Sequence, residues 1–165
     1  MAIGTPATVA LTRAGIAFVA HEYHAASANG ASAGRGAGYG LEAASALGVD
    51  PDRVFKTLLA EVESVGLVIG IVPVSGNLDL KALAAAAGGK RAAMAAADVA
   101  ERKTGYVVGG ISPVGQKTSL PAFLDETAQL WPSVYVSGGR RGFDIELDPA
   151  DLLAAIGGRY ADIAR

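Results

Sequence analysis

The sequence predicts an α+β fold. Two apolar runs rich in β-branched residues, 54–62 and 65–74, follow one another and are typical of paired central strands. Helix-like and strand-like segments are mixed along the rest of the chain without regular βαβ alternation, which favours a single α+β layer or a partly closed sheet. A length of 165 residues suits one compact domain, covering 1–165.

The remaining elements follow from caps, glycine stops and alternation. Thr5 followed by Pro6 predicts a capped first helix with proline in its first turn, and Asp148 followed by Pro149 predicts the last helix. Alternating apolar and polar residues in 143–147 predict a strand. Further helices are expected over 41–47, 78–87 and 98–102, and Asn77 or Asp79 is the expected cap of the second of these. Further strands are expected over 18–23, 120–124 and 133–137.

The amino-acid composition excludes several classes of protein function. The chain has no cysteine, which excludes disulfides, thiolate nucleophiles and cysteine-ligated zinc, and fits a cytoplasmic protein. Its 14 Lys and Arg against 16 Asp and Glu give a net charge of −2, which excludes a uniformly basic nucleic-acid binder but leaves a local basic face open. No apolar run approaches the roughly 20 residues that span a membrane, and the first residues lack the pattern of a secretory signal. We therefore expect no membrane partner.

A glycine- and alanine-rich stretch, 25–40, stands apart in composition. It has almost no large apolar residue, so it cannot bury enough surface to offset its ordering entropy. We expect a flexible surface loop there, and no domain boundary, because only about two dozen residues precede it.

Lys56 is the first candidate for chemistry. It lies within the apolar run 54–62, and strand alternation places it on the face opposite Phe55 and Thr57. A lysine on a central strand is costly to bury unless its ammonium faces a cleft or meets a carboxylate. An edge-strand lysine, whose stem packs while its head reaches water, explains the same pattern.

Two carboxylates, Asp144 and Glu146, alternate on the strand predicted over 143–147 and share a face. A paired-carboxylate site is one interpretation, and two acids on the solvated face of a strand is the commoner one. Asp144 gains functional interest only if it meets Lys56 across strands.

Two glycine-rich loops could contact oxygen atoms. In Gly109–Gly115 the glycines allow backbone N–H groups to approach a bound oxygen closely, and Pro113 fixes the bend, although a tight structural turn is the alternative. In Ser137–Gly142, the guanidinium groups of Arg140 and Arg141 suit phosphate contacts. Further cations could follow an RNA backbone if they share a face: Lys81, Lys90, Arg91, Arg102, Lys103 and Lys117.

Motifs for metals, nucleotides and nucleophilic triads are weak. The string 34–40 lacks the third glycine of GxGxxG and a preceding strand, and no GxxxxGK[ST] occurs. His21 and His24 are three residues apart with no clear further ligands. A serine-histidine-aspartate triad stays open, although no GxSxG elbow supports it. We expect no metal and no cofactor.

Six strings in this order form a specific combination. They are TPA (5–7), VFKTLL (54–59), PVSGNLDLK (73–81), TGYVVGGISPVGQK (104–117), YVSGGRRGFDIEL (135–147) and YADIAR (160–165). Together they resemble the YbaK/prolyl-tRNA-synthetase-associated family of trans-editing deacylases. The resemblance covers nearly the whole chain except 25–40, which is longer and richer in glycine than the family's usual connection.

The resemblance implies a single compact α+β domain with a mixed, barrel-like β-sheet surrounded by helices. It also assigns residues by position. The family's key lysine is Lys56, its GxxP loop begins at Gly110, and its pocket aspartate is Asp144; these three are the expected catalytic residues. The expected substrate-binding residues are Tyr23, Gly109, Ile111, Ser112, Pro113, Ser137, Gly138 and Arg140.

Members of this family hydrolyse the ester that links a wrong amino acid to the 3′ end of a tRNA. The resemblance therefore implies trans-editing of a mischarged tRNA, with Cys-tRNA(Pro) as the expected substrate and a prolyl-tRNA synthetase as a further partner. Lys56 would orient the terminal adenosine or a phosphate and support developing charge, and the loop at Gly110 would offer backbone donors to the ester oxygen. The substrate's own thiol would attack the ester, with a lyase-type cyclisation as one form of this step.

Two alternatives stay open. One is a deacylase for Ala-tRNA or another mischarged tRNA, since family membership does not fix pocket volume. The other is a module that binds tRNA or a synthetase without turnover. Release of amino acid from charged tRNA separates the enzyme from the binding module.

Overall fold

The computed structural model describes residues 4–24 and 39–165. The predicted loop 25–40 lies outside the described residues except for its last two, Tyr39 and Gly40, which begin a helix instead. The α-helices are α1 (Pro6–Ala14), α2 (Tyr39–Leu47), α3 (Leu80–Ala87), α4 (Ala97–Thr104) and α5 (Pro149–Ile156), with short 3₁₀ helices η2 (Pro51–Arg53) and η3 (Glu126–Leu130). The strands are β1 (Val19–Glu22), β2 (Phe55–Val62), β3 (Gly66–Pro73), β4 (Ala92–Met94), β5 (Ala122–Asp125), β6 (Val134–Arg140), β7 (Phe143–Leu147) and β8 (Arg159–Ala161).

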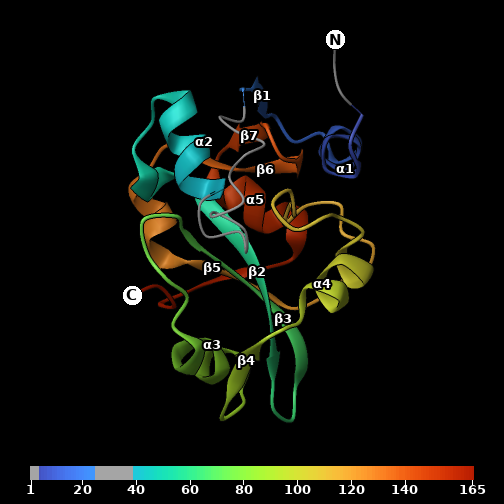
Figure 1. Ribbon diagram of the computed structural model, residues 1–165, viewed down its shortest axis with the longest axis vertical. Helices are drawn as coiled ribbons and strands as arrows, with labels where there is room; N and C mark the ends of the chain where they lie inside the picture. The colour runs from blue at the N-terminus through green and yellow to red at the C-terminus, as the bar shows by residue number, and fades with distance from the viewer. Residues whose placement is uncertain (1–3, 25–38) are drawn as a thin grey trace.

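The strands of the described residues form two sheets. A three-stranded antiparallel sheet has the order β1-β7-β6, and a five-stranded mixed sheet has the order β4-β2-β3-β5-β8. Long strands β2 and β3 run down the molecule, and the three-stranded sheet lies across their upper end (Figure 1). A single parallel bridge between Val54 and Tyr135 links the two sheets.

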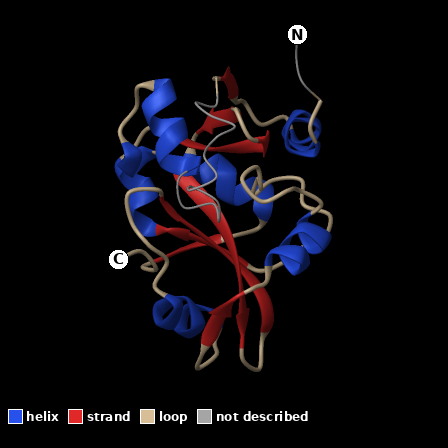
Figure 2. Cartoon of the chain, in the orientation of Figure 1, coloured by secondary structure: helices blue, strands red, loops and turns tan. Residues whose placement is uncertain are grey.

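The α+β class is confirmed, but the barrel-like sheet is not. Within residues 4–24 and 39–165, the strands divide between two sheets that do not close on each other, because one bridge alone joins them. The predicted pairing of the two apolar runs is confirmed by the antiparallel register from Phe55 opposite Pro73 to Val62 opposite Gly66. The short strands β4 and β8 are additions that the sequence did not predict. Figure 2 shows α5 between the two sheets and the other α-helices around them.

Helix ends follow the predicted caps. The Thr5 side chain accepts a hydrogen bond from the Thr8 amide, and the Thr8 side chain caps the Thr5 amide in return. Asp79 and Asp148 cap α3 and α5 through the amides of their first turns. These local contacts set where three helices begin, and the rest of the fold depends on packing.

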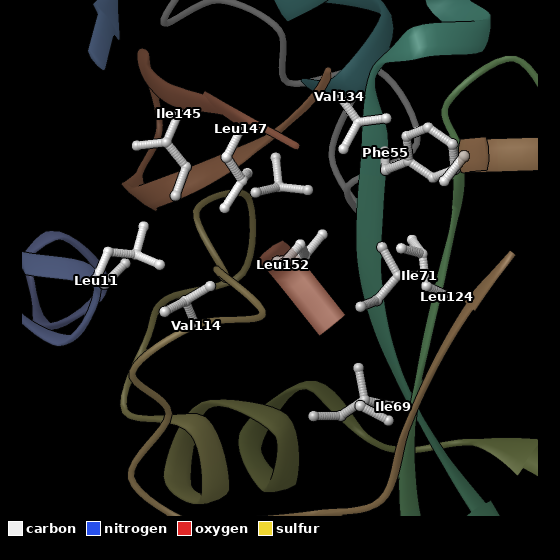
Figure 3. Close-up of a cluster of buried hydrophobic side chains, with 14 of the residues drawn as sticks. Leu11, Phe55, Ile69, Ile71, Val114, Leu124, Val134, Ile145, Leu147 and Leu152 are labelled. Carbon is white, nitrogen blue, oxygen red and sulfur yellow. The ribbon is translucent and has the colours of Figure 1, made fainter. Parts of the chain in front are cut away.

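The main hydrophobic core lies between the two sheets. Leu152 of α5 is fully buried there, between Ile145 and Leu147 of the three-stranded sheet and Ile71 and Leu124 of the five-stranded sheet (Figure 3). A second cluster lies on the other face of the five-stranded sheet, under α3. Both faces of the five-stranded sheet are thus used for packing.

A buried carboxylate holds the end of the chain against β5. Asp125 is 1 % exposed, and its Oδ1 accepts hydrogen bonds from the amides of Ile163 (3.0 Å) and Ala164 (2.9 Å). Its Oδ2 accepts from the Thr127 amide and hydroxyl, at 3.2 and 2.5 Å. Four donors therefore compensate the burial of this charge.

Replacing Asp125 should destabilise the fold more than replacing an exposed cap. Asp125→Ala leaves the Ile163 amide buried without an acceptor, so we expect a loss of about 3 kcal/mol in the free energy of unfolding. The matched control, Asp148→Ala at the cap of α5, should cost about 1 kcal/mol. Urea unfolding of both variants measures the difference, and equal losses would show that the Asp125 contacts do not hold the chain end.

Candidate active site

A cavity with a volume of about 470 Å³ opens where the three-stranded sheet meets the part of β2 around Lys56. Six of the predicted site residues line it: Tyr23, Lys56, Gly109, Ile111, Ser137 and Asp144. They come from β2, β6, β7, the end of β1 and the loop after α4. Residues that are far apart in the sequence thus meet at one place.

Lys56 lines the cavity from a part of β2 that does not pair with β4. β4 pairs with β2 only from Ala60 to Val62, so the part of β2 around Lys56 has no strand on that edge among the described residues. The side chain is half-buried, and burial lowers the pKa of its ammonium below the ordinary value. Both interpretations of this lysine are therefore partly right: the strand is internal to its sheet, yet this edge opens onto a cleft.

Asp144 is the buried acid of the site. It is 5 % exposed, and burial raises the pKa of its carboxyl group to about 7, an effect that a hydrogen bond from Tyr23 partly opposes. The Tyr23 hydroxyl lies 3.5 Å from Asp144 Oδ1, at the long end of the hydrogen-bonding range. Burial, and secondly the charge of Asp144, raise the pKa of the Tyr23 hydroxyl well above its usual range, so this phenol remains a donor.

Asp144 and Glu146 share a face as predicted, but their surroundings differ. Glu146 lies outside the cavity lining and accepts hydrogen bonds from Ser133 Oγ (2.5 Å), His21 Nε2 (2.9 Å) and Arg53 Nη2 (3.4 Å). The Ser133 hydrogen bond is the main reason that the pKa of Glu146 is lowered. The interpretation of both acids as solvated strand residues is wrong for Asp144, which is buried.

Lys56 and Asp144 line the same cavity but form no ion pair among the described residues. Burial is the only cause of the lowered lysine pKa and the largest cause of the raised aspartate pKa. The site therefore holds a cation and an acid without neutralising either, which leaves both available to a ligand.

The glycine-rich loop is divided between the cavity and the core. Gly109 and Ile111 line the cavity, and their amide N–H groups have no hydrogen-bond acceptor among the described residues. The Gly110 amide instead donates to the Val107 carbonyl at 2.9 Å. The expectation that the Gly110 amide is a free donor is thus wrong for this structure, because a turn already uses it.

The rest of this loop has a structural part. Gly110 packs so closely on the Arg140 backbone that a Cβ would lie 2.7 Å from Arg140 Cα. Ser112 is fully buried; its Oγ accepts from the Val114 amide at 3.2 Å, and Pro113 beside it is buried as well. Ser112 and Pro113 do not line the cavity, contrary to the expected substrate contact, because they hold the turn that presents their neighbours.

The Ser137–Gly142 string is divided in the same way. Ser137 lines the cavity, whereas Gly138 is buried against the Phe143 ring and its carbonyl accepts from Thr5 Oγ1 at 2.6 Å. Arg140 is exposed, outside the cavity, and forms an ion pair with Glu22 at 3.0 Å. The structure therefore gives Gly138 a packing role and places Arg140 away from the cavity lining.

The other predicted cations come from separate segments. Lys81 lies at the start of α3, whereas Lys90 and Arg91 lie between the end of α3 and β4. Backbone hydrogen bonds of 2.9 and 3.0 Å join the segment at Lys117 to the end of α4, which carries Lys103. Arg141 is bound to Glu42 at 2.9 Å.

Most residues of the cavity wall were not assigned to the site from the sequence, and Tyr39 and Thr57 are the two of these with hydroxyl groups. Tyr39 lines the cavity, and its ring lies 4.4 Å from the Arg141 guanidinium carbon and next to Gly109. Thr57 lines the cavity from β2, although alternation placed it opposite Lys56. Both strand faces reach the cavity because it opens at the edge of β2, and no sequence signal reports such an edge.

Comparison with known proteins fits this arrangement. The family model described as "Aminoacyl-tRNA editing domain" matches residues 39–155, which contain most of the cavity lining. The chain belongs to the aminoacyl-tRNA editing family. The YbaK-type resemblance of the sequence strings is thereby confirmed.

Individual relatives support the same family. This editing domain is 41% identical over 120 residues to the "Putative Cys-tRNA(Pro)/Cys-tRNA(Cys) deacylase EbsC" of Enterococcus faecalis, covering 73% of each chain. The crystal structure of a "putative trans-editing enzyme for prolyl tRNA synthetase" is similar with a TM-score of 0.79 at 29% identity, over 99% of both chains. A crystal structure of a hypothetical protein shares the fold with a TM-score of 0.82 at 24% identity, over 98% of this chain and 100% of the other.

Membrane-spanning helices and metal-binding clusters are both absent from the described residues. None of the described helices has the length and apolar character needed to cross a bilayer. The described residues also contain no group of three or more His, Asp or Glu side chains placed to hold a metal ion.

The raised pKa of Asp144 predicts a pH-dependent stability. Between about pH 4 and 7 the folded protein keeps a proton that the unfolded chain has released, so the free energy of unfolding should fall as pH rises through this window. The fall should be on the order of 4 kcal/mol, fully absent below the unfolded pKa and complete above the folded one. Asp144→Asn should lack this slope. Parallel profiles of wild type and Asp144→Asn in urea unfolding at several pH values would contradict the assignment.

Proposed function

We propose that this editing domain hydrolyses Cys-tRNA(Pro), with the cysteinyl thiol of the substrate as the nucleophile. The observation that supports the proposal is a cavity with a cation, a buried acid and free amides but no activated protein nucleophile. The chain has no cysteine. Ser137 is the one serine among the described residues that line the cavity. His21 is hydrogen-bonded to Glu146 and is therefore not available to activate the Ser137 hydroxyl.

Asp144 supplies the proton transfer. With a pKa of about 7 it is ionised in part of the molecules near neutrality and protonated in the rest, which suits a group that must both take and return a proton. The ionised form takes the thiol proton as sulfur attacks the ester carbonyl carbon. The protonated form then gives that proton to the departing 3′ oxygen of the tRNA, which leaves as a hydroxyl. The Tyr23 hydroxyl, which donates to Asp144, keeps the carboxyl group oriented.

Lys56 and the glycine-rich loop stabilise the negative charge that develops on the carbonyl oxygen. Lys56 places an ammonium in the cavity, and the unpaired amides of Gly109 and Ile111 are the donors that the loop offers. Gly110 serves these two by fixing the turn through its bond to Val107. The attack of sulfur on the carbonyl carbon closes a four-membered ring, and cleavage of the carbon–oxygen bond then releases the tRNA and leaves the thiolactone of cysteine, which water opens to the free amino acid. The protein contributes position and electrostatics to each step.

A prolyl-tRNA synthetase is the partner that we propose. A synthetase pocket discriminates against a smaller or similar amino acid by only about 1–3 kcal/mol for each methylene group, so a second site is needed to remove errors. The description of a structural relative as a trans-editing enzyme for prolyl tRNA synthetase supports this pairing for the present chain. Cations at the end of α4, around Lys103 and Lys117, are the proposed contacts to tRNA phosphates.

A deacylation panel tests the proposal. Purified protein should clear Cys-tRNA(Pro) at least about 100-fold faster than Ser-tRNA(Pro) or Ala-tRNA(Pro), because a thiol with a pKa near 8.5 is partly ionised at neutrality and a hydroxyl is not. Pro-tRNA(Pro) should remain intact. Equal rates for the cysteinyl and seryl or alanyl substrates would mean that a bound water is the nucleophile and would favour an Ala-tRNA-type deacylase. Tight tRNA binding without any turnover would favour the binding module.

Lys56→Ala should remove most of the activity. We expect a loss of about 10²–10³ in the single-turnover rate with Cys-tRNA(Pro), the effect of deleting one preorganised electrostatic group. The fold should persist, because this half-buried ammonium has no ion-pair partner among the described residues. Lys81→Ala, an exposed lysine on α3, is the matched control and should keep the wild-type rate. A rate within a few-fold of wild type for Lys56→Ala would overturn its role.

A further inference from the structure

One buried hydroxyl in the cavity wall has no partner in the protein. Thr57 is 8 % exposed and lines the cavity, and its Oγ1 has no hydrogen-bond partner among the described residues. Gln116 Oε1 shares this condition, but Gln116 is not part of the cavity lining. An unpaired buried hydroxyl is unfavourable, and a valine of nearly the same shape would fill the position without that cost. Packing therefore does not account for the hydroxyl.

The surroundings of Thr57 are apolar. Strand alternation puts it on the same face of β2 as Phe55 and Leu59, which also line the cavity and belong to the main core. Ala100 and Ile111 line the cavity and pack in the same cluster. The side chains of this wall thus form a small apolar surface, in which Thr57 supplies the one side-chain hydroxyl.

The other polar groups of the cavity lie elsewhere. Lys56 projects from the opposite face of β2, and Asp144 and Ser137 belong to the three-stranded sheet. Those groups suit the ester and the charged ends of an aminoacyl adenosine. The apolar wall instead suits a small side chain that has one weakly polar atom, and the mercaptomethyl side chain of cysteine (–CH₂SH) is of this kind.

We propose that Thr57 determines specificity by donating a hydrogen bond from its hydroxyl to the sulfur of the cysteinyl group. A rotation about the Cα–Cβ bond exchanges hydroxyl and methyl positions without moving the strand, so the hydroxyl can be presented when the substrate binds. The hydrogen bond holds the sulfur and favours its ionised form. This inference rests on the proposed deacylation of Cys-tRNA(Pro) and adds the residue that reads its side chain.

Binding of non-hydrolysable analogues tests the inference separately from turnover. The probes are 3′-aminoacylamido-adenosines in which an amide replaces the ester, carrying cysteine, alanine or 2-aminobutyrate, the last having a methyl group in place of the thiol. Wild-type protein should bind the cysteinyl probe about fivefold more tightly than the 2-aminobutyryl probe. Thr57→Val should bind both equally, and Thr57→Ser should restore the preference.

Stability supplies the check for a merely structural role. Thr57→Val removes no hydrogen bond within the described residues, so its thermal midpoint should equal or exceed that of wild type. A preference for cysteine that survives in Thr57→Val, or an equal loss of affinity for all three probes, would overturn the inference. If wild-type protein hydrolyses Cys-tRNA(Pro), either result leaves the proposed function standing. Absence of both hydrolysis and probe binding in wild type would overturn the two together.

Discussion

The antiparallel pairing of β2 with β3 is the constraint on which the rest of the structure depends. Eight consecutive residues are in register, with Lys56 opposite Val72. Phe55 and Leu59 enter the main core, while Ala60 and Val62 enter the second cluster under α3. A slip of one residue would turn Lys56 into the main core and Phe55 to the opposite face of β2, exchanging every side chain between the two faces. The hydrophobic pattern that builds the core therefore also places the cation of the site.

The second condition is the incomplete edge of β2. Because β4 pairs only with its far end, the near end meets the three-stranded sheet through one bridge and leaves a cavity between the sheets. β7 presents Asp144 to that cavity, and its other face presents Phe143 and Ile145 to the core. The carboxyl group is buried by the same packing that makes the sheet stable, and this burial is what brings its pKa to about 7. The packing of the sheet therefore gives Asp144 a pKa at which it can exchange protons near neutral pH.

Local signals in the sequence predict the local parts of the structure. The caps at Thr5, Asp79 and Asp148 and the alternation of β7 are read from neighbouring residues, and the structure confirms them. β4 and β8 were missed because each is three residues long and exists through pairing with β2 and β5. The motif strings indicated which residues gather at the cavity. They could not separate Gly109 and Ile111, which line it, from Gly110 and Ser112, which support the turn, because that division depends on contacts with Arg140 and Val107.

The central claim is that the substrate's own sulfur attacks its ester. The most direct test is rapid-quench deacylation of Cys-tRNA(Pro) with mass spectrometry of the first released product, using a protein-free sample as the control. Attack by sulfur predicts that a species lighter than cysteine by one water, the thiolactone, rises and then decays as cysteine forms. Release of cysteine itself in step with free tRNA, with no such species at any time, would contradict the claim.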